Sequence, residues 1–148
     1  MINSSTSPRL IAAILDAPGV AVIGRVFLTA PFWISGALKL FDRPSAVAEA
    51  AHFGLRPAAL VAGVVILLQI GGSLAVVVNR SVWLGAGALG VFTALANVVG
   101  HAFWTIPDPM ARFHDMNAFL ANLGLIGGLA LAAILAGSPR ERRRSGAF

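Results

Sequence analysis

Residues 57–79 read PAALVAGVVILLQIGGSLAVVVN and contain no Asp, Glu, Lys or Arg. A transmembrane helix needs about 20 consecutive apolar residues to cross about 30 Å of hydrocarbon. Two further windows, 81–107 and 116–139, are also free of these charges and are long enough to span. We therefore interpret the chain as an integral membrane protein.

The composition of the whole chain supports this interpretation. Of its 148 residues, 57% are hydrophobic and 11% are charged, whereas an ordinary soluble domain carries about 25% charged residues. This composition excludes a typical soluble enzyme and a disordered segment. The chain has no cysteine, which excludes disulfides, thiol redox chemistry, and cysteine-ligated zinc or iron–sulfur centres.

A fourth apolar stretch, residues 18–41, is interrupted only by Arg25 and Lys39. In lipid every backbone polar group must be satisfied internally, and these continuous apolar runs fit helices rather than a barrel. The predicted transmembrane helices are 19–40, 57–78, 82–104 and 114–136. The sequence thus predicts an all-α, four-helix membrane bundle with antiparallel neighbours, forming a single membrane domain over residues 1–148.

The connections between these helices carry local signals. Residues 41–56 predict a short interfacial helix between the first two spans, with Asp42 and Ser45 as candidate N-caps and Gly54 as a candidate C-cap. Residues 105–112 contain two prolines, so we expect a loop there. The pattern GAGALG at 85–90 matches a dinucleotide fingerprint, but it lacks the strand–helix context that this fingerprint requires.

Small residues recur at four-residue spacing, which lets membrane helices approach closely. The two seams are Ala86, Gly90 and Ala94 in the third helix, and Gly124, Gly128, Ala132 and Ala136 in the fourth. Such seams are also candidate surfaces for homo-oligomerisation.

The positive charges indicate an orientation. Arg9, Arg80 and the arginines of 140–144 lie on one side of the predicted bundle, against Lys39, Arg43, Arg56 and Arg112 on the other. By the positive-inside rule, the tails 1–17 and 138–148 are both expected to be cytoplasmic, in the inner membrane of a bacterium. We interpret the arginines as topology anchors near anionic headgroups, not as a nucleic-acid surface.

A charged side chain at membrane depth costs about 2.5–3.5 kcal/mol on insertion scales, so polar side chains there are expected to have a structural or functional role. In three helices such residues share a face with glycine, at a spacing near 100° per residue. The faces are Arg25, Phe32, Gly36 and Lys39; Gly90, Thr93, Asn97, His101 and Trp104; and His114, Asn117, Gly124 and Gly128. We predict that these faces point into the bundle and that Asn122 points elsewhere.

Counting about 1.5 Å of rise per residue groups these side chains by depth. Arg25 and Gln69 come out at about 9 and 13 Å from the cytoplasmic side, so we predict that they form a hydrogen-bonded inner layer. Asn97 and Asn122 both come out near 21 Å, again at about 1.5 Å per residue. The members of the predicted outer polar cluster are Lys39, His101, Trp104, His114 and Asn117.

Plainer roles stay open for the same residues. Arg25 is equally compatible with snorkelling to the headgroups, and His101 with a hydrogen-bonded interfacial position. Asn97, Asn122 and Gln69 are compatible with interhelical hydrogen bonds alone. Three separated histidines do not form a metal-site pattern, so no metal is predicted, and no residue set identifies a catalytic centre.

Several short motifs resemble those of the DoxX family of small four-helix bacterial membrane proteins. The motifs are Gly24-Arg25 with Phe32, Gly36 and Lys39; Phe53-Gly54-Leu55 with Pro57; Gln69-Ile70-Gly71-Gly72; His101-Ala102-Phe103-Trp104; and Phe119-Leu120-Ala121-Asn122 with Gly127-Gly128. The resemblance covers about residues 24–137. This chain departs from the family pattern at Gln69, where Glu is common, and at Ala121, where Lys is common.

The resemblance implies an association with thiosulfate:quinone oxidoreductase and related membrane oxidoreductase complexes. The first hypothesis is therefore a membrane subunit near a quinone, with His101 bonded to a quinone carbonyl and Lys39 or Asn117 assisting. The sequence itself requires no cofactor, and electrons would come from a partner or from a bound cofactor. The alternatives are a non-catalytic membrane scaffold or assembly factor and a small-solute pathway along Arg25, Asn97 and Asn122.

Overall fold

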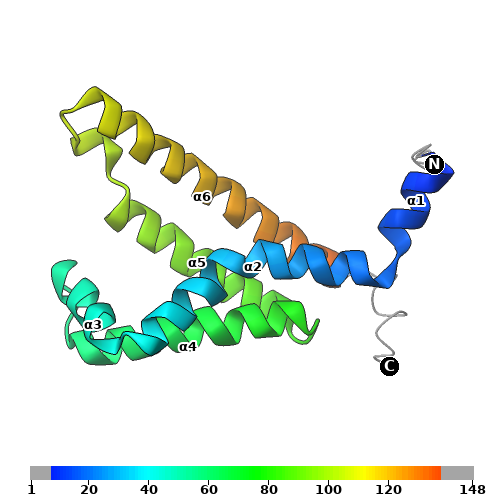
Figure 1. Ribbon diagram of the computed structural model, residues 1–148, viewed down its shortest axis with the longest axis horizontal. Coiled ribbons are helices and arrows are strands. Elements are labelled where there is room, and N and C mark those ends of the chain that lie inside the picture. The colour runs from blue at the N-terminus through cyan, green and yellow to red at the C-terminus, as the bar shows by residue number, and fades with distance from the viewer. Residues whose placement is uncertain (1–7, 138–148) are drawn as a thin grey trace.

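The computed structural model describes residues 8–137, and this part of the chain contains helices and no strand (Figure 1). The elements are α1 (Arg9–Asp16), α2 (Pro18–Phe41), α3 (Arg43–His52), α4 (Ala58–Val77), α5 (Val82–Gly100), the 3₁₀ turn η1 (Phe103–Thr105) and α6 (Pro109–Ala136). By length and composition, α2, α4, α6 and the stretch comprising α5 and η1 can each span a membrane. The predicted all-α membrane bundle is confirmed.

Of the predicted tails, only residues 8–17 are among those described. They form α1, a helix that the sequence analysis did not predict, with Leu10, Ile14 and Leu15 exposed. Ala17 is extended and Pro18 begins α2, so the chain changes direction between the two helices, as Figure 1 shows. The predicted cytoplasmic positions of 1–7 and 138–148 lie outside the described residues.

The long helices pack in sequence order. α2 packs on α4, α4 on α5, and α5 on α6, while α2 and α6 touch over a much shorter length. Figure 1 shows the result: α6 and the later part of α5 diverge from the layer made by α2, α3 and α4. The two parts meet where Gly128 of α6 faces Leu28 of α2.

Glycines bring α4 and α5 into close contact. A Cβ placed on Gly85 would lie 2.7 Å from the carbonyl oxygen of Gly72, so a side chain there would force the helices apart. Val76 and Leu89 are fully buried beside this contact. The GAGALG stretch therefore works in close packing, as predicted, although the close approach is at Gly85 while Gly90 has open space around it.

The interfacial helix α3 forms as predicted. The Asp42 carboxylate accepts a hydrogen bond from the backbone N–H of Ser45 at 3.1 Å, which caps the first turn. Gly54 follows the helix with a φ of +71°, a conformation that glycine adopts without strain. The chain then leaves α3 at an angle that brings α4 back beneath it.

The predicted span 82–104 agrees with the span Val82–Thr105, within which α5 ends at Gly100 and η1 follows. One predicted boundary differs from the structure: α6 begins at Pro109 rather than at residue 114, because the Asp108 carboxylate accepts from the Ala111 N–H at 2.7 Å and caps the helix. Proline fits the first turn of a helix, where its missing N–H is not needed, so Pro109 starts the helix instead of breaking it.

The predicted inner face of the fourth helix is wrong at three of its four residues. His114, Asn117 and Gly124 are exposed, whereas Gly128 packs against Leu28 of α2. Asn122, which was expected to point elsewhere, bonds to α5. The side of α6 that packs on the bundle is mostly apolar and includes the buried Leu129. Polar residues and glycine guided the prediction, but on this helix they lie largely on the outside.

Candidate functional site

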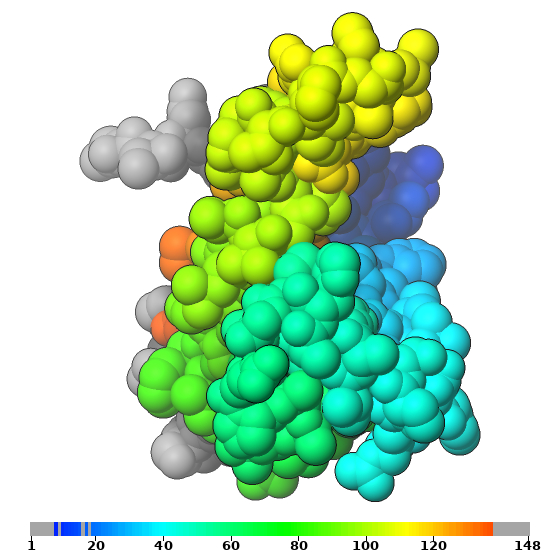
Figure 2. Space-filling model, turned by 90° about the vertical axis from the view of Figure 1, so that its left-hand side faces the viewer, coloured from blue at the N-terminus to red at the C-terminus, as the bar shows by residue number. Residues whose placement is uncertain are grey.

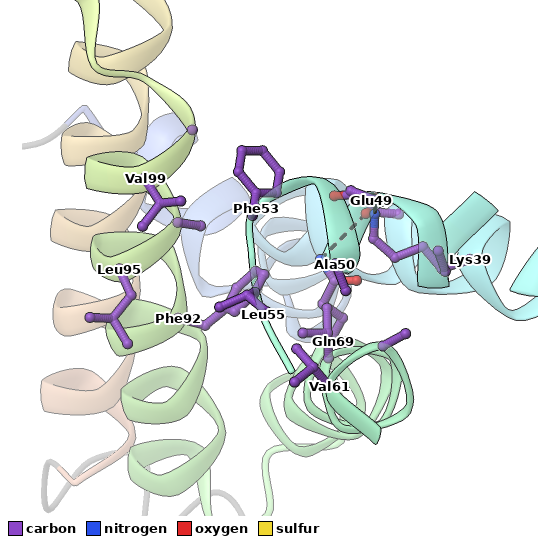
Figure 3. A pocket seen from close by; sticks show the side chains of 16 residues that line it. Lys39, Glu49, Ala50, Phe53, Leu55, Val61, Gln69, Phe92, Leu95 and Val99 are labelled. Atoms are coloured by element: carbon purple, nitrogen blue, oxygen red, sulfur yellow. Dashed lines mark hydrogen bonds and ion pairs between the residues drawn. The ribbon is translucent and has the colours of Figure 1, made fainter. Parts of the chain in front are cut away.

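A pocket of about 340 Å³ lies between α2, α3, α4 and α5. Figure 3 shows Leu95 and Val99 of α5 on one side, Phe53 and Leu55 opposite, and the pair Lys39–Glu49 at the far end. In the space-filling view, α3 and the segment after it cover this region and adjoin the end of α5 (Figure 2). The lining is mainly apolar, and its polar members are Ser35, Lys39, Glu49 and Gln69.

The polar end of the pocket is built by the turn from α2 into α3. Lys39 lies in the last turn of α2, and its Nζ donates to Glu49 Oε2 of α3. The Lys39 side chain is 19% exposed and that of Glu49 is 51% exposed, so the pair reaches from the pocket to its rim. The ammonium and carboxylate leave this end of the pocket without net charge.

Asp42 holds this turn together. The hydrogen bonds from the Ser45 side chain and then from its backbone N–H lower the pKa of Asp42 below its ordinary value of 3.8. The carboxylate therefore stays ionised at neutral pH and keeps the cap that places Glu49 over Lys39.

Gln69 lines the pocket from α4 and is 4% exposed. Its Nε2 donates to Ser35 Oγ at 3.3 Å, and its buried Oε1 has no hydrogen-bond partner. Three other buried polar side chains are satisfied within their own helices: the Thr29, Ser73 and Thr93 hydroxyls each donate to the carbonyl four residues earlier. Gln69 is thus the buried group of the pocket with bonding capacity to spare.

The predicted Arg25–Gln69 hydrogen bond is not formed. Gly36 packs against Gln69 and Ile70, which puts Gln69 level with Ser35, about 15 Å along α2 from Arg25 at about 1.5 Å per residue. The depth count assumed that the start of α2 lies level with the end of the antiparallel α4. In the structure α2 extends beyond the end of α4. Arg25 is half-buried near the other end of α2, where its carbonyl accepts from Thr29 Oγ1 at 2.8 Å.

A second polar group joins α5 to α6. Asn122 Nδ2 donates to Asn97 Oδ1 at 2.9 Å, and Asn97 Nδ2 donates to the Phe119 carbonyl at 3.2 Å. Asn97 is 2% exposed. The depth count placed these two asparagines at one level, and their contact agrees with it.

A third polar contact lies at the end of the same two helices. His101 Nδ1 is 2.8 Å from Asp115 Oδ1, while Asp115 Oδ2 is buried without a partner. Beside it, Phe103 and Trp104 of η1 pack edge-on against Phe119 of α6, with ring centroids 5.4 and 6.1 Å away. Together these contacts hold η1 against α6.

The structure divides the predicted outer cluster. Lys39 faces the pocket, whereas His101 pairs with Asp115 and is not among the pocket residues. Trp104, His114 and Asn117 are exposed. No group of three or more metal-type ligands occurs between residues 8 and 137.

Sequence reasoning missed Glu49 and Ser35 as pocket residues and did not single out Asp115. The segment 41–56, predicted as a helix between the first two spans, contains two carboxylates, Asp42 as a candidate cap and Glu49 within the helix. Because that helix must fold back over its neighbours, an ion pair between Glu49 and the nearby Lys39 could have been predicted from the sequence. Ser35 carried no signal beyond its place one residue before Gly36.

The model of the DoxX family matches residues 20–102 of this chain. The chain belongs to the DoxX family. Every residue that lines the pocket falls within the matched part of this DoxX protein, as does His101, whereas Asp115 and Asn122 fall outside it. The comparisons with curated proteins and with solved structures found no match.

In this DoxX protein the arrangement suits one kind of ligand. A largely apolar cavity with a few convergent polar groups binds small molecules whose polar atoms fix their orientation. Lys39 supplies charged N–H donors and Gln69 an amide. The paired charges of Lys39 and Glu49 favour a neutral ligand over an ion.

Proposed function

We propose that this protein is a membrane subunit of an oxidoreductase system and binds the ring of a lipid-soluble quinone in the pocket between α2 and α5. The observation that carries the proposal is the mainly apolar pocket of about 340 Å³ that ends at Lys39 and Gln69. Membership of the DoxX family supports the oxidoreductase association.

The chemistry of a quinone matches this lining. Its ring is flat and apolar, and its carbonyl oxygens accept hydrogen bonds. The Lys39 ammonium has three N–H donors, and the bond to Glu49 uses one of them. The Gln69 amide has two N–H donors, of which one bonds Ser35. Its unpaired Oε1 is an acceptor, so only the hydroxyl of the reduced quinol can donate to it.

The remaining parts of the proposal follow from the sequence. The chain contains no cysteine, so the electrons that reduce or oxidise the quinone would pass through a partner subunit or a bound cofactor. We place the protein in the bacterial inner membrane with both termini in the cytoplasm, because the positive-inside rule favours a cytoplasmic position for the more arginine-rich flanks, which carry Arg80 and the arginines of 140–144.

The test is quinone binding by the purified protein. Lipid extracts of protein from native membranes are assayed for quinone, and the protein is titrated with a short-tailed benzoquinone. We expect saturable binding that Lys39→Met weakens by about tenfold or more, because a hydrogen bond to a charged donor is worth about 1.5–3 kcal/mol.

Two control variants make the test specific. Arg43→Met removes an exposed cation from the same turn outside the pocket, and His101→Ala removes the residue that the sequence predicted as the quinone ligand; both should bind normally. No saturable binding, or equal losses in Lys39→Met and Arg43→Met, would contradict the proposal. Loss in His101→Ala alone would place the quinone at the α5–α6 end instead. Absence of binding together with a stable crosslinked partner would favour the scaffold alternative.

A further inference from the structure

The pocket adjoins an open groove on the surface of α4 and α5. This groove has a volume of about 550 Å³, and its lining consists entirely of apolar residues. Val65, Phe92 and Leu95 line both the pocket and the groove. The two cavities therefore share a wall, and the polar groups lie on the pocket side of it.

The direction of the groove follows the helices. It begins beside Leu95 and extends along α5 to Trp83, about 18 Å at about 1.5 Å per residue. The polar end, at Lys39 and Glu49, adjoins the end of α2 and the turn into α3. A molecule that occupied both cavities would have its polar part near one edge of the membrane and its apolar part along the spanning helices, ending at Trp83 in the first turn of α5, near the opposite edge.

The groove has room that no side chain of the described chain fills. Gly87 lies in it, and a Cβ there would meet nothing within 4 Å. Trp83 is 70% exposed and Val91 is 63% exposed. Bulk lipid could cover any such surface. Because this groove shares lining residues with a pocket that holds polar groups, we assign it to the tail of the molecule bound in that pocket.

We infer that the pocket and the groove form a single site for a long-tailed amphiphile, with its ring in the pocket and a prenyl or similar apolar tail along α5 as far as Trp83. The inference rests on the proposed function and adds the ligand class: a tailed quinone rather than a free ring. A tail moving from lipid to the groove gains packing and little hydrophobic free energy, so its effect is chiefly on position.

Photolabelling tests that position. The probe is a prenylated benzoquinone with a diazirine at the far end of its tail, added to the protein in nanodiscs at an equimolar ratio. Mass spectrometry should find the label between Trp83 and Gly87, and excess unlabelled prenylated quinone should remove most of it. A second probe with the diazirine beside the ring should label the α3 segment or the later half of α5.

Filling the groove provides the matched variant. Gly87→Leu should reduce labelling near Trp83 severalfold, whereas Gly127→Leu, at an open glycine on α6, should leave it unchanged. Thermal unfolding of both variants checks that each remains folded.

The possible results separate the two proposals. Labelling spread over the lipid-facing side of α6 and insensitive to competitor would mean bulk partitioning and would overturn the inference. Normal binding of the short-tailed ring with tail labels away from Trp83 would overturn the groove alone. Failure of the short-tailed ring to bind in the Lys39 titration would overturn the proposed function itself.

Discussion

The polar residues inside this bundle form two regions that look alike in sequence and differ in structure. Between α5 and α6, Asn97 and Asn122 bond each other and His101 bonds Asp115 across helices that pack directly together. Between α2 and α4, Lys39 and Gln69 line a cavity, and Gln69 has an amide oxygen without a partner. The first region consists of contacts between protein groups, although Asp115 Oδ2 has no partner there either. The second region places its unpaired amide oxygen beside a pocket.

The difference shows how an intramembrane polar residue can be assigned a role. A polar side chain in lipid is costly, so it must be either a packing contact or part of a site. Hydrogen bonds that satisfy a buried side chain across a helix–helix contact indicate packing, as for Asn97. A buried amide beside a cavity, as for Gln69, indicates a site. The following variants test this division, from the largest expected effect on stability to the smallest.

Asn97→Ala should have the largest effect on stability. It removes the bonds to Asn122 and to the Phe119 carbonyl, and such interhelical bonds are worth about 0.6–1.7 kcal/mol each in membranes. We expect a loss of about 2 kcal/mol in the free energy of unfolding, measured by SDS titration. Asn117→Ala, on the exposed side of α6, is the control and should change little. Equal losses in the two variants would contradict the assignment of Asn97 as a packing contact.

His101→Ala should cost less, about 1 kcal/mol, because it leaves the Asp115 carboxylate without its partner but near water. The double variant His101→Ala/Asp115→Ala should recover part of this loss, since no unpaired carboxylate remains. A double-mutant cycle by SDS titration measures the coupling. A cycle with no coupling would show that the 2.8 Å contact contributes nothing to stability.

The fold was largely predictable because its signals are local. Windows such as 57–79 lack charge over a membrane-spanning length, and Asp42 and Gly54 identify the ends of α3 from their neighbours alone. The boundary near Pro109 failed because proline both ends and begins helices. The sequence did not show whether residues 109–113 belong to the loop after α5 or to the first turn of α6.

The candidate site was predictable only in part. Lys39 and Gln69 were selected for their polarity at membrane depth, but their partners depend on how far one helix slides along its neighbour. The close contact of Gly36 with Gln69 and Ile70 sets that register for α2 and α4. The residues around Arg25 give no information about this register. For the same reason Glu49 went unnoticed, since only the fold brings α3 over Lys39.

Gln69→Leu should separate stability from binding. The substitution loses the bond to Ser35 and also removes the unpaired buried oxygen, so the free energy of unfolding should change by less than about 0.5 kcal/mol. Quinone affinity in the same titration should nevertheless fall severalfold. A clear loss of stability with unchanged affinity would place Gln69 with Asn97 among the packing contacts and remove the distinction between the two regions.

The smallest effect concerns Asp42, whose cap fixes α3 over the pocket and touches nothing in the α5–α6 region. Its pKa is lowered in the folded protein by the Ser45 hydrogen bonds. The cap therefore stabilises fully at pH values above the ordinary value of 3.8, and this contribution is lost as the pH falls through the lowered folded pKa. Asp42→Asn keeps a capping side chain that does not titrate. Acidification from pH 7 to about pH 3 should thus accelerate hydrogen exchange in α3 of the parent protein relative to Asp42→Asn, with α6 equal in both. If α3 responds equally in both proteins, the Asp42 cap does not cause the acid sensitivity of α3, and the prediction is wrong.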